Sequence, residues 1–202
     1  FSKPFGDEKY RWKIIPDTNG RMHMEDLNPI AEITPTFDPL NDIQYLLFTR
    51  RNPTTPQRLT MNMDTVRNSN YVVGNGVRFI IHGWQGSAST AMNTFITRDL
   101  LVRADHNVIV VDWSRGGDTT IYNNARQNVG SAGGGISRFI DTMHAEVLVS
   151  FENINIIGHN LGGHVAGFAG KQVTRGRINA IFANDPSLDG FNAGQPTQRL
   201  IF

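Results

Sequence analysis

The sequence contains no cysteine among its 202 residues. This absence excludes a disulfide scaffold, zinc bound by cysteine and a thiol nucleophile. The chain also lacks an excess of one charge, because 19 Lys and Arg residues balance 18 Asp and Glu residues. A nearly neutral chain without a basic run gives no electrostatic basis for binding nucleic acid, so we expect no nucleic-acid partner. No apolar run approaches the roughly 18 residues that a membrane-spanning helix needs.

The usual patterns of metal and phosphate sites are missing as well. The sequence has no His-Glu-x-x-His, no clustered aspartates, no Gly-x-Gly-x-x-Gly and no P-loop. We therefore expect no metal and no cofactor. What is present is a 39% hydrophobic composition. It suits a chain with a sizeable core, of a length that fits one domain or a large part of a bigger one.

The beginning of the chain differs in pattern from the rest. Residues 1–40 are rich in proline and polar side chains and show no sustained hydrophobic period. This pattern predicts an irregular arm laid over a domain that covers residues 41–202. Because the chain begins with Phe1 rather than Met, we expect an upstream segment to have been removed, together with any export signal.

Short apolar runs recur at wide intervals along the domain. They are rich in β-branched residues and do not alternate cleanly, which is typical of strands covered on both faces. These runs are residues 43–48, 77–81, 108–111, 154–157 and 178–182. Segments of helical length lie between them, at residues 90–102 and 136–149. The alternation predicts an α/β fold with a mostly parallel sheet.

Ligands of an open α/β sheet collect at the carboxyl ends of its strands. The run that ends at Ile157 continues into residues 158–164, Gly-His-Asn-Leu-Gly-Gly-His. Gly158 and Gly162 flank Asn160 at the spacing of a nucleophile elbow, a strand-to-helix turn that needs neighbours of almost no size. The central residue is asparagine, where nucleophilic chemistry requires serine.

This segment resembles the Gly-His-Ser-Leu-Gly-Gly-His elbow of the pancreatic lipase family, which includes insect neutral lipases and wasp venom phospholipases. Further motifs that resemble the family follow its order: residues 47–53 (its early strand), 79–84 (its oxyanion strand), 110–113 (its next strand) and 184–186 (its Leu-Asp-Pro). The resemblance covers about residues 43–202. It implies an α/β-hydrolase fold, a mostly parallel sheet flanked by helices, incomplete at the C-terminus of this chain.

The resemblance also implies a role for each matching position. The backbone N–H groups of Trp84 and Leu161 would form the oxyanion hole, and Asp185 would orient a histidine. Asn160 would occupy the place of the nucleophile. The catalytic histidine would lie beyond Phe202, since none of the six histidines stands at a matching position. From the residues alone, Asp185 is equally well read as a buried carboxylate that accepts backbone N–H groups.

The remaining histidines have no sequence context that suggests catalysis or metal binding. Three belong to the backbone motifs and three stand apart from any motif: His82, His159 and His164 in the first set, His23, His106 and His144 in the second. We expect the first three to be structural.

An asparagine cannot replace the attacking serine. Its carboxamide nitrogen is poorly basic, its oxygen only accepts hydrogen bonds, and neither atom forms an acyl-enzyme. Loss of the nucleophile in a triad costs about 10⁶-fold in turnover. We therefore expect almost no ester hydrolysis. Asparagine tolerates unusual backbone conformations, so the turn at Asn160 can stay folded.

The function suggested by the resemblance is that of the insect yolk and egg-specific proteins, which have lost the serine. It implies a secreted protein kept in yolk granules as a nutrient reservoir, with lipid binding left open. The alternative is an active triglyceride lipase or phospholipase A1 whose serine was replaced by Asn160. As partner we expect a C-terminal fragment of the same precursor, held non-covalently. A homo-oligomer remains open.

Overall fold

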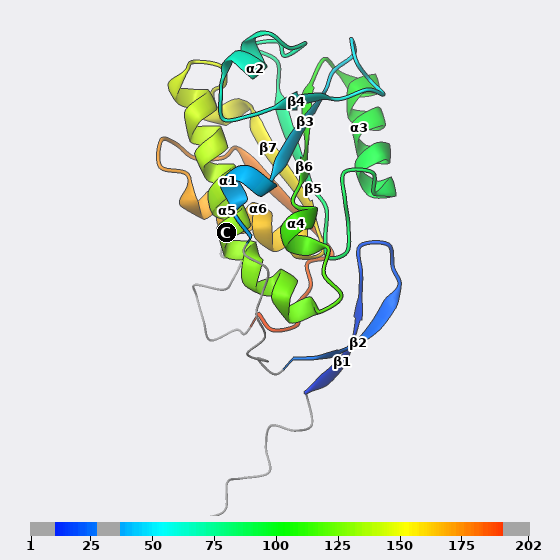
Figure 1. The fold of residues 1–202 in the computed structure, drawn as a ribbon. Helices are drawn as coiled ribbons and strands as arrows, with labels where there is room; N and C mark the ends of the chain where they lie inside the picture. Colours follow the sequence, from blue (N-terminus) through cyan, green and yellow to red (C-terminus); the bar gives the residue numbers. More distant parts are fainter. Residues whose placement is uncertain (1–10, 28–36, 192–202) are drawn as a thin grey trace, which may run out of the picture.

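The computed structural model describes residues 11–27 and 37–191. At its centre is a six-stranded sheet in the order β4-β3-β6-β5-β7-β8 (Figure 1). The strands are β3 (Gln44–Phe48), β4 (Gln57–Leu59), β5 (Val77–Ile81), β6 (Asn107–Asp112), β7 (Ile154–His159) and β8 (Ala180–Asn184). Strands β5 to β8 pair in parallel, and β3 is antiparallel to both β4 and β6. The predicted mostly parallel sheet is thus confirmed.

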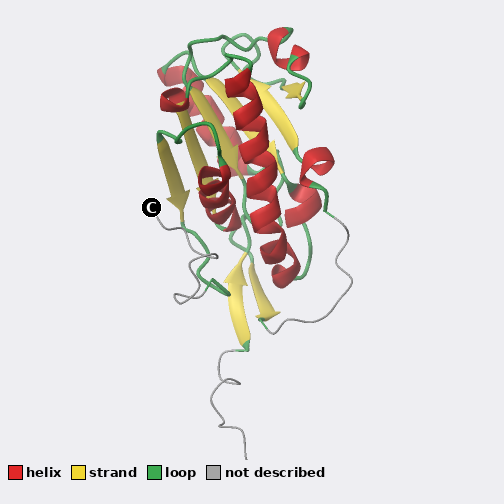
Figure 2. Ribbon diagram, turned by 90° about the vertical axis from the view of Figure 1, so that its left-hand side faces the viewer, coloured by secondary structure: helices red, strands yellow, loops and turns green. Residues whose placement is uncertain are grey.

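Helices cover both faces of this sheet. Figure 2 looks onto the face covered by α5 and α6, and α3 lies on the opposite face. The helices are α1 (Pro39–Asp42), α2 (Asp64–Arg67), α3 (Ala91–Arg103), α4 (Ser114–Gly117), α5 (Tyr122–Ala145) and α6 (Leu161–Gln172), with a short 3-10 helix η2 (Phe151–Asn153). Within the described residues, none of these helices is both long enough and apolar enough to cross a membrane.

Helix α5 begins well before the predicted start at residue 136. Its first half contains small residues, including Ala125, Ala132 and Gly133, all of them buried. A Cβ added at Gly133 would lie 2.5 Å from the Cβ of Phe168 in α6, so small size is what lets the two helices approach. Small residues give no apolar period, which is why the sequence pattern missed this half of the helix.

The prediction of an irregular arm is wrong for part of residues 1–40. Strand β1 (Trp12–Pro16) pairs with the antiparallel strand β2 (Met22–Asp26) in a hairpin, and Gly20 in its turn has a φ of +80°. Ile15 is fully buried, yet the outward side chains are apolar too: Trp12, Ile14, Met22 and Met24. Because apolar residues lie on both faces of the hairpin, its strands lack the alternation of apolar and polar residues by which a strand is recognised in a sequence. The rest of the predicted arm, residues 1–10 and 28–36, lies outside the described residues.

Candidate active site: an asparagine at the nucleophile elbow

Asn160 stands between the last residue of β7 and the first residue of α6, with φ 53° and ψ −124°. The positive φ strains a side chain at this position, and the ψ lies outside the small left-handed region in which asparagine is common. A Cβ at Gly158 would clash with the carbonyl of Gly162, and a Cβ at Gly162 would clash with the carbonyl of His82. Both glycines are therefore required for the helix to pass so close to the sheet.

The carboxamide of Asn160 is 3% exposed and uses both of its polar ends. Its Oδ1 accepts a hydrogen bond from the backbone N–H of Trp84 at 3.2 Å. Its Nδ2 donates to the carbonyl oxygen of Pro16 at 3.3 Å. Since the backbone N–H of Trp84 is one of the two expected oxyanion donors, the side chain at the nucleophile position itself occupies that donor. Leu161, the other expected donor, is the first residue of α6, where backbone N–H groups have no partner within the helix.

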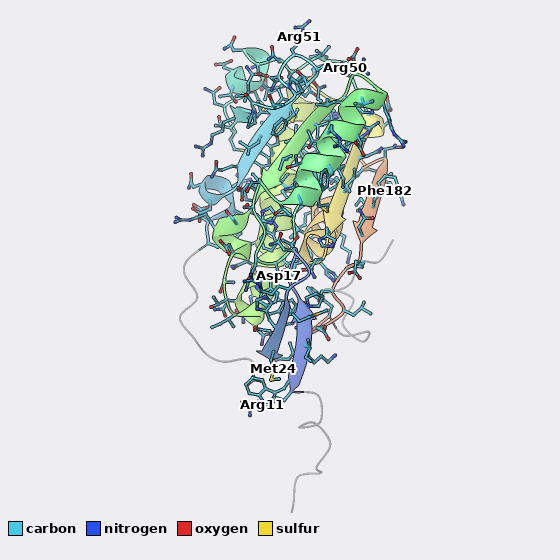
Figure 3. All side chains as sticks on the ribbon, turned by 90° about the vertical axis from the view of Figure 1, so that its right-hand side faces the viewer. Arg11, Asp17, Met24, Arg50, Arg51 and Phe182 are labelled. Carbon is cyan, nitrogen blue, oxygen red and sulfur yellow. The ribbon has the colours of Figure 1, made fainter. Side chains whose placement is uncertain are left out.

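The turn of the N-terminal hairpin covers the elbow. Thr18 donates its backbone N–H to the carbonyl of Trp84 at 2.9 Å. Its hydroxyl accepts from the backbone N–H of Gly83 and lies 3.2 Å from Nδ1 of His159. Figure 3 shows the neighbouring Asp17 where the hairpin meets the carboxyl end of the sheet. These contacts join residues far apart in the sequence, so no local pattern could have predicted them.

An aspartate–histidine pair closes this turn. Nε2 of His23 lies 3.0 Å from Oδ2 of Asp17, whose Oδ1 accepts from the N–H groups of Asn19 and Arg21. Burial would raise the pKa of Asp17, but the hydrogen bonds from His23, Arg21 and Asn19 outweigh it and hold the pKa below its usual value. The His23 ring meets the Trp84 ring edge-on at 4.8 Å. Sequence reasoning gave His23 no role.

Asp185, the expected acid of the triad, follows β8 with a φ of 44° and is exposed. Within the described residues the carboxylate is thus not buried. Within residues 11–27 and 37–191, no histidine lies within hydrogen-bonding distance of this carboxylate. The nearest link is electrostatic: burial lowers the pKa of His159, and the charge of Asp185 opposes that shift. The structure therefore brings Asn160 and Trp84 together but not Asp185 and a histidine.

Two histidines of the backbone motifs have structural partners. His82 is fully buried, with Nδ1 2.9 Å from the carbonyl of Gly83 and Nε2 accepting from the backbone N–H of Trp113. Nε2 of His164 lies 2.5 Å from the carbonyl of Ser187. Burial lowers the pKa of His164, which keeps its imidazole neutral. Both rings thus hold loops in place. Among the described residues, no group of three or more His, Cys, Asp or Glu could hold a metal ion.

The parallel sheet, with a buried strand that enters a tight elbow and then a helix, has the α/β-hydrolase fold. Esterase 2 of Thermogutta terrifontis, solved with bound butyrate, is a structural neighbour with a TM-score of 0.45 and 14% sequence identity. The match covers 81% of this chain and 58% of that one.

Comparison with known sequences gives the family. Pancreatic triacylglycerol lipase of Myocastor coypus is 35% identical over 157 residues, which are 78% of this chain and 34% of that protein. Lipase member H-A of Xenopus laevis is 36% identical over 190 residues, 92% of this chain and 40% of that protein. The chain thus spans well under half the length of these relatives. The family model named Lipase matches residues 17–201, beginning within the hairpin turn. The chain belongs to the lipase family.

Proposed function

We propose that this chain is a non-hydrolytic member of the lipase family, which keeps the scaffold and has lost ester cleavage. The observation that carries the proposal is the carboxamide of Asn160, whose Oδ1 accepts from the N–H of Trp84. A carboxamide cannot form an acyl-enzyme. The oxyanion donor is also engaged, so a substrate carbonyl would have to displace an existing hydrogen bond.

The test is fluorophosphonate labelling and tributyrin hydrolysis by the complete natural protein, beside its Asn160→Ser and Asn160→Asp variants. We expect no labelling and no turnover above background for the natural protein and for Asn160→Asp, which lacks a hydroxyl. Tributyrin turnover by the natural protein at the rate of a working lipase would refute the proposal. Labelling of Asn160→Ser would mean that one substitution silences an otherwise intact site. Failure of that variant to label would mean that the site has lost more than its serine.

For the biological role we propose storage: a secreted protein kept in egg yolk granules as a nutrient reservoir, with lipid as a cargo. The support is the resemblance to the yolk branch of the family, namely asparagine at position 160 and a sequence without cysteine.

We further propose that another segment of the same precursor, held non-covalently, packs against this chain. The support is the edge of the sheet, because β8 is the last strand in its order among the described residues. Phe182 of β8 is 51% exposed there, and Figure 3 shows it beside α3 rather than beneath it. An edge strand with an exposed aromatic side chain is a site at which another segment can pair or pack.

One measurement addresses both proposals: denaturing electrophoresis of egg extracts through development, with mass spectrometry of the bands. We expect an abundant band for this chain that declines as the embryo grows, and a second band from the same precursor that co-purifies under native conditions. A scarce or constant chain would contradict storage. A single band after native purification would contradict the partner.

The second candidate function is an active triglyceride lipase in which asparagine has replaced the serine. It is favoured by the 35% identity to pancreatic triacylglycerol lipase. The sequence of the natural gene at codon 160 decides between the two: a serine codon supports the enzyme, and an asparagine codon supports the non-hydrolytic protein.

A further inference from the structure

The connection between α6 and β8 presents two arginines to solvent. Residues 174–177, Thr-Arg-Gly-Arg, are all exposed, and Figure 1 shows the connection in orange at the edge of the molecule. Within the described residues, neither the Arg175 nor the Arg177 guanidinium has an acidic partner or any other hydrogen bond. Both side chains are therefore available to a partner that recognises arginine.

The backbone of this connection is available as well. Gly176 and Arg177 neither donate nor accept a backbone hydrogen bond anywhere in residues 11–27 and 37–191. An enzyme that cuts a protein chain holds it as an extended strand, whose N–H and C=O groups pair with the enzyme. Exposed loops of this kind are the preferred places for such cuts. The segment has no internal hydrogen bonds to lose at these two residues.

The other basic residues of the described chain are held in place. Arg11 and Arg50 use their guanidinium groups in ion pairs at 2.6 and 3.2 Å. The backbone N–H groups of Arg21 and Arg51 donate to neighbouring side chains. All remaining Lys and Arg residues outside the connection lie within helices or strands. Among the residues that the structure describes, Arg177 is thus the one basic residue outside helices and strands that has no hydrogen bond.

Two anchors limit the movement of the loop. The carboxylate of Asp141 in α5 accepts from the backbone N–H groups of Thr174 and Arg175 at 2.9 to 3.2 Å, and from the Thr174 hydroxyl at 2.8 Å. On the other side, Ile178 is buried. A substrate must extend over several residues in a protease site, so the loop has to leave Asp141 before it is cut. Cleavage of a folded protein follows the population of such locally opened states.

We propose that this loop is a processing site for an arginine-specific endopeptidase, which cuts the bond between Arg177 and Ile178. An acidic pocket in the enzyme would bind the Arg177 guanidinium through charge-assisted hydrogen bonds. The exposed residues 174–176 precede this bond and can enter the enzyme, whereas the end of α6 precedes Arg175. Water adds across the bond, which leaves a carboxylate on Arg177 and an amino group on Ile178. The proposal holds whether or not Asn160 silences hydrolysis.

The cut would not separate the two pieces of the folded chain. Strand β8 pairs with β7 along its whole length. Beyond the strand, Nζ of Lys13 lies 2.5 Å from the carboxylate of Asp189, and the hydroxyls of Tyr122 and Ser187 lie 2.7 Å apart. Since these contacts cross the cut, we expect a nicked protein whose pieces stay together until it is denatured.

The first test is brief digestion of the complete natural protein, in its folded state, with trypsin and separately with a lysine-specific endopeptidase. We expect the first tryptic cut within residues 37–191 to follow Arg177, as read by mass spectrometry. Lys171 in the last turn of α6 should resist the second enzyme. A first tryptic cut at another bond of residues 37–191, or no cut there, would overturn the proposal. Equally fast cutting after Lys171 would also overturn it, because the end of α6 would then unravel as a whole.

Three variants locate the cut and the anchor. Arg177→Gln removes the charge that the enzyme binds, so cutting of the loop should slow by about 10⁴-fold. Arg138→Gln on the exposed side of α5 is the matched control and should be cut like the natural protein. Asp141→Ala releases the loop and should speed the cut about tenfold. Undiminished cutting of Arg177→Gln within the loop, or an unchanged rate for Asp141→Ala, would contradict the proposed site.

The natural protein then shows whether the site is used. Protein purified from its natural source is digested with an endopeptidase that cuts after glutamate, so that a peptide beginning at Ile178 can arise only from earlier processing. We expect mass spectrometry to detect this peptide beside the intact one. Its absence from material of every stage of the protein's life would overturn the proposal.

Discussion

The two faces of the central sheet are packed very differently. On the face of α5 and α6, large side chains are fully buried, and Phe139 of α5 stacks on Tyr45 of β3 with ring centroids 3.9 Å apart. On the face of α3, the buried cluster is small and consists of Ile80, Leu101, Val108 and Val110. One face is thus a close-packed core, and the other contains a cavity of about 600 Å³ beside α3 and two buried polar atoms, Oδ1 of Asn93 and Oγ1 of Thr97, that have no hydrogen-bond partner among the described residues.

The same strands supply both faces. In β6, Val108 and Val110 belong to the small cluster, whereas Ile109 and Val111 belong to the large core. Successive side chains of a strand point to opposite faces, and the face of α3 also receives Arg78 of β5 and Asn155 of β7, which lie in register with Val108. The difference comes from both layers, because the α3 face of the sheet is less apolar and α3 buries Asn93 and Thr97 beside Leu101, whereas α5 buries Phe139. Stability is therefore expected to reside mainly on the α5 and α6 face.

The largest expected effect is a difference in stability between two substitutions to alanine, one on each face of the sheet. Phe139→Ala should cost about 3–5 kcal/mol of unfolding free energy, because it opens a cavity in a close-packed core. Leu101→Ala should cost about 2 kcal/mol, the low end for leucine, because its neighbours already border open space. Urea denaturation of the complete protein, followed by fluorescence, measures both.

The two losses can be compared only if both variants have the same dependence of unfolding free energy on urea concentration. A changed dependence would mean that the unfolding transition itself has changed. Equal losses for the two variants, or a larger loss for Leu101→Ala, would show that the α3 face is as well packed as the other. In that case the cavity would not be a stable feature of the protein.

The features of the fold that depend on local sequence patterns could be predicted from the sequence. Apolar runs marked the central strands, and the spacing of Gly158 and Gly162 indicated the elbow, because a tight turn constrains its own neighbours. Contacts between distant residues could not be predicted. Asn160 bonds to the carbonyl of Pro16 across most of the chain, and the pairing of Asp17 with His23 depends on a hairpin whose apolar residues point both ways. The inward polar residues of α3 were missed for the same reason, since only the tertiary fold shows which side faces the sheet.

The smallest expected effect is a difference in unfolding free energy between two variants, each of which removes one buried hydroxyl from one face of the sheet. Ser137 of α5 is 3% exposed and donates to the carbonyl of Gly134 at 2.8 Å, so Ser137→Ala should cost about 0.5–1.5 kcal/mol. Thr97→Val removes a hydroxyl without a partner and keeps the shape, so it should be neutral or stabilising by up to about 1 kcal/mol. Thermal unfolding measures this difference in sign, and a clear loss for Thr97→Val would show that its hydroxyl is bonded after all.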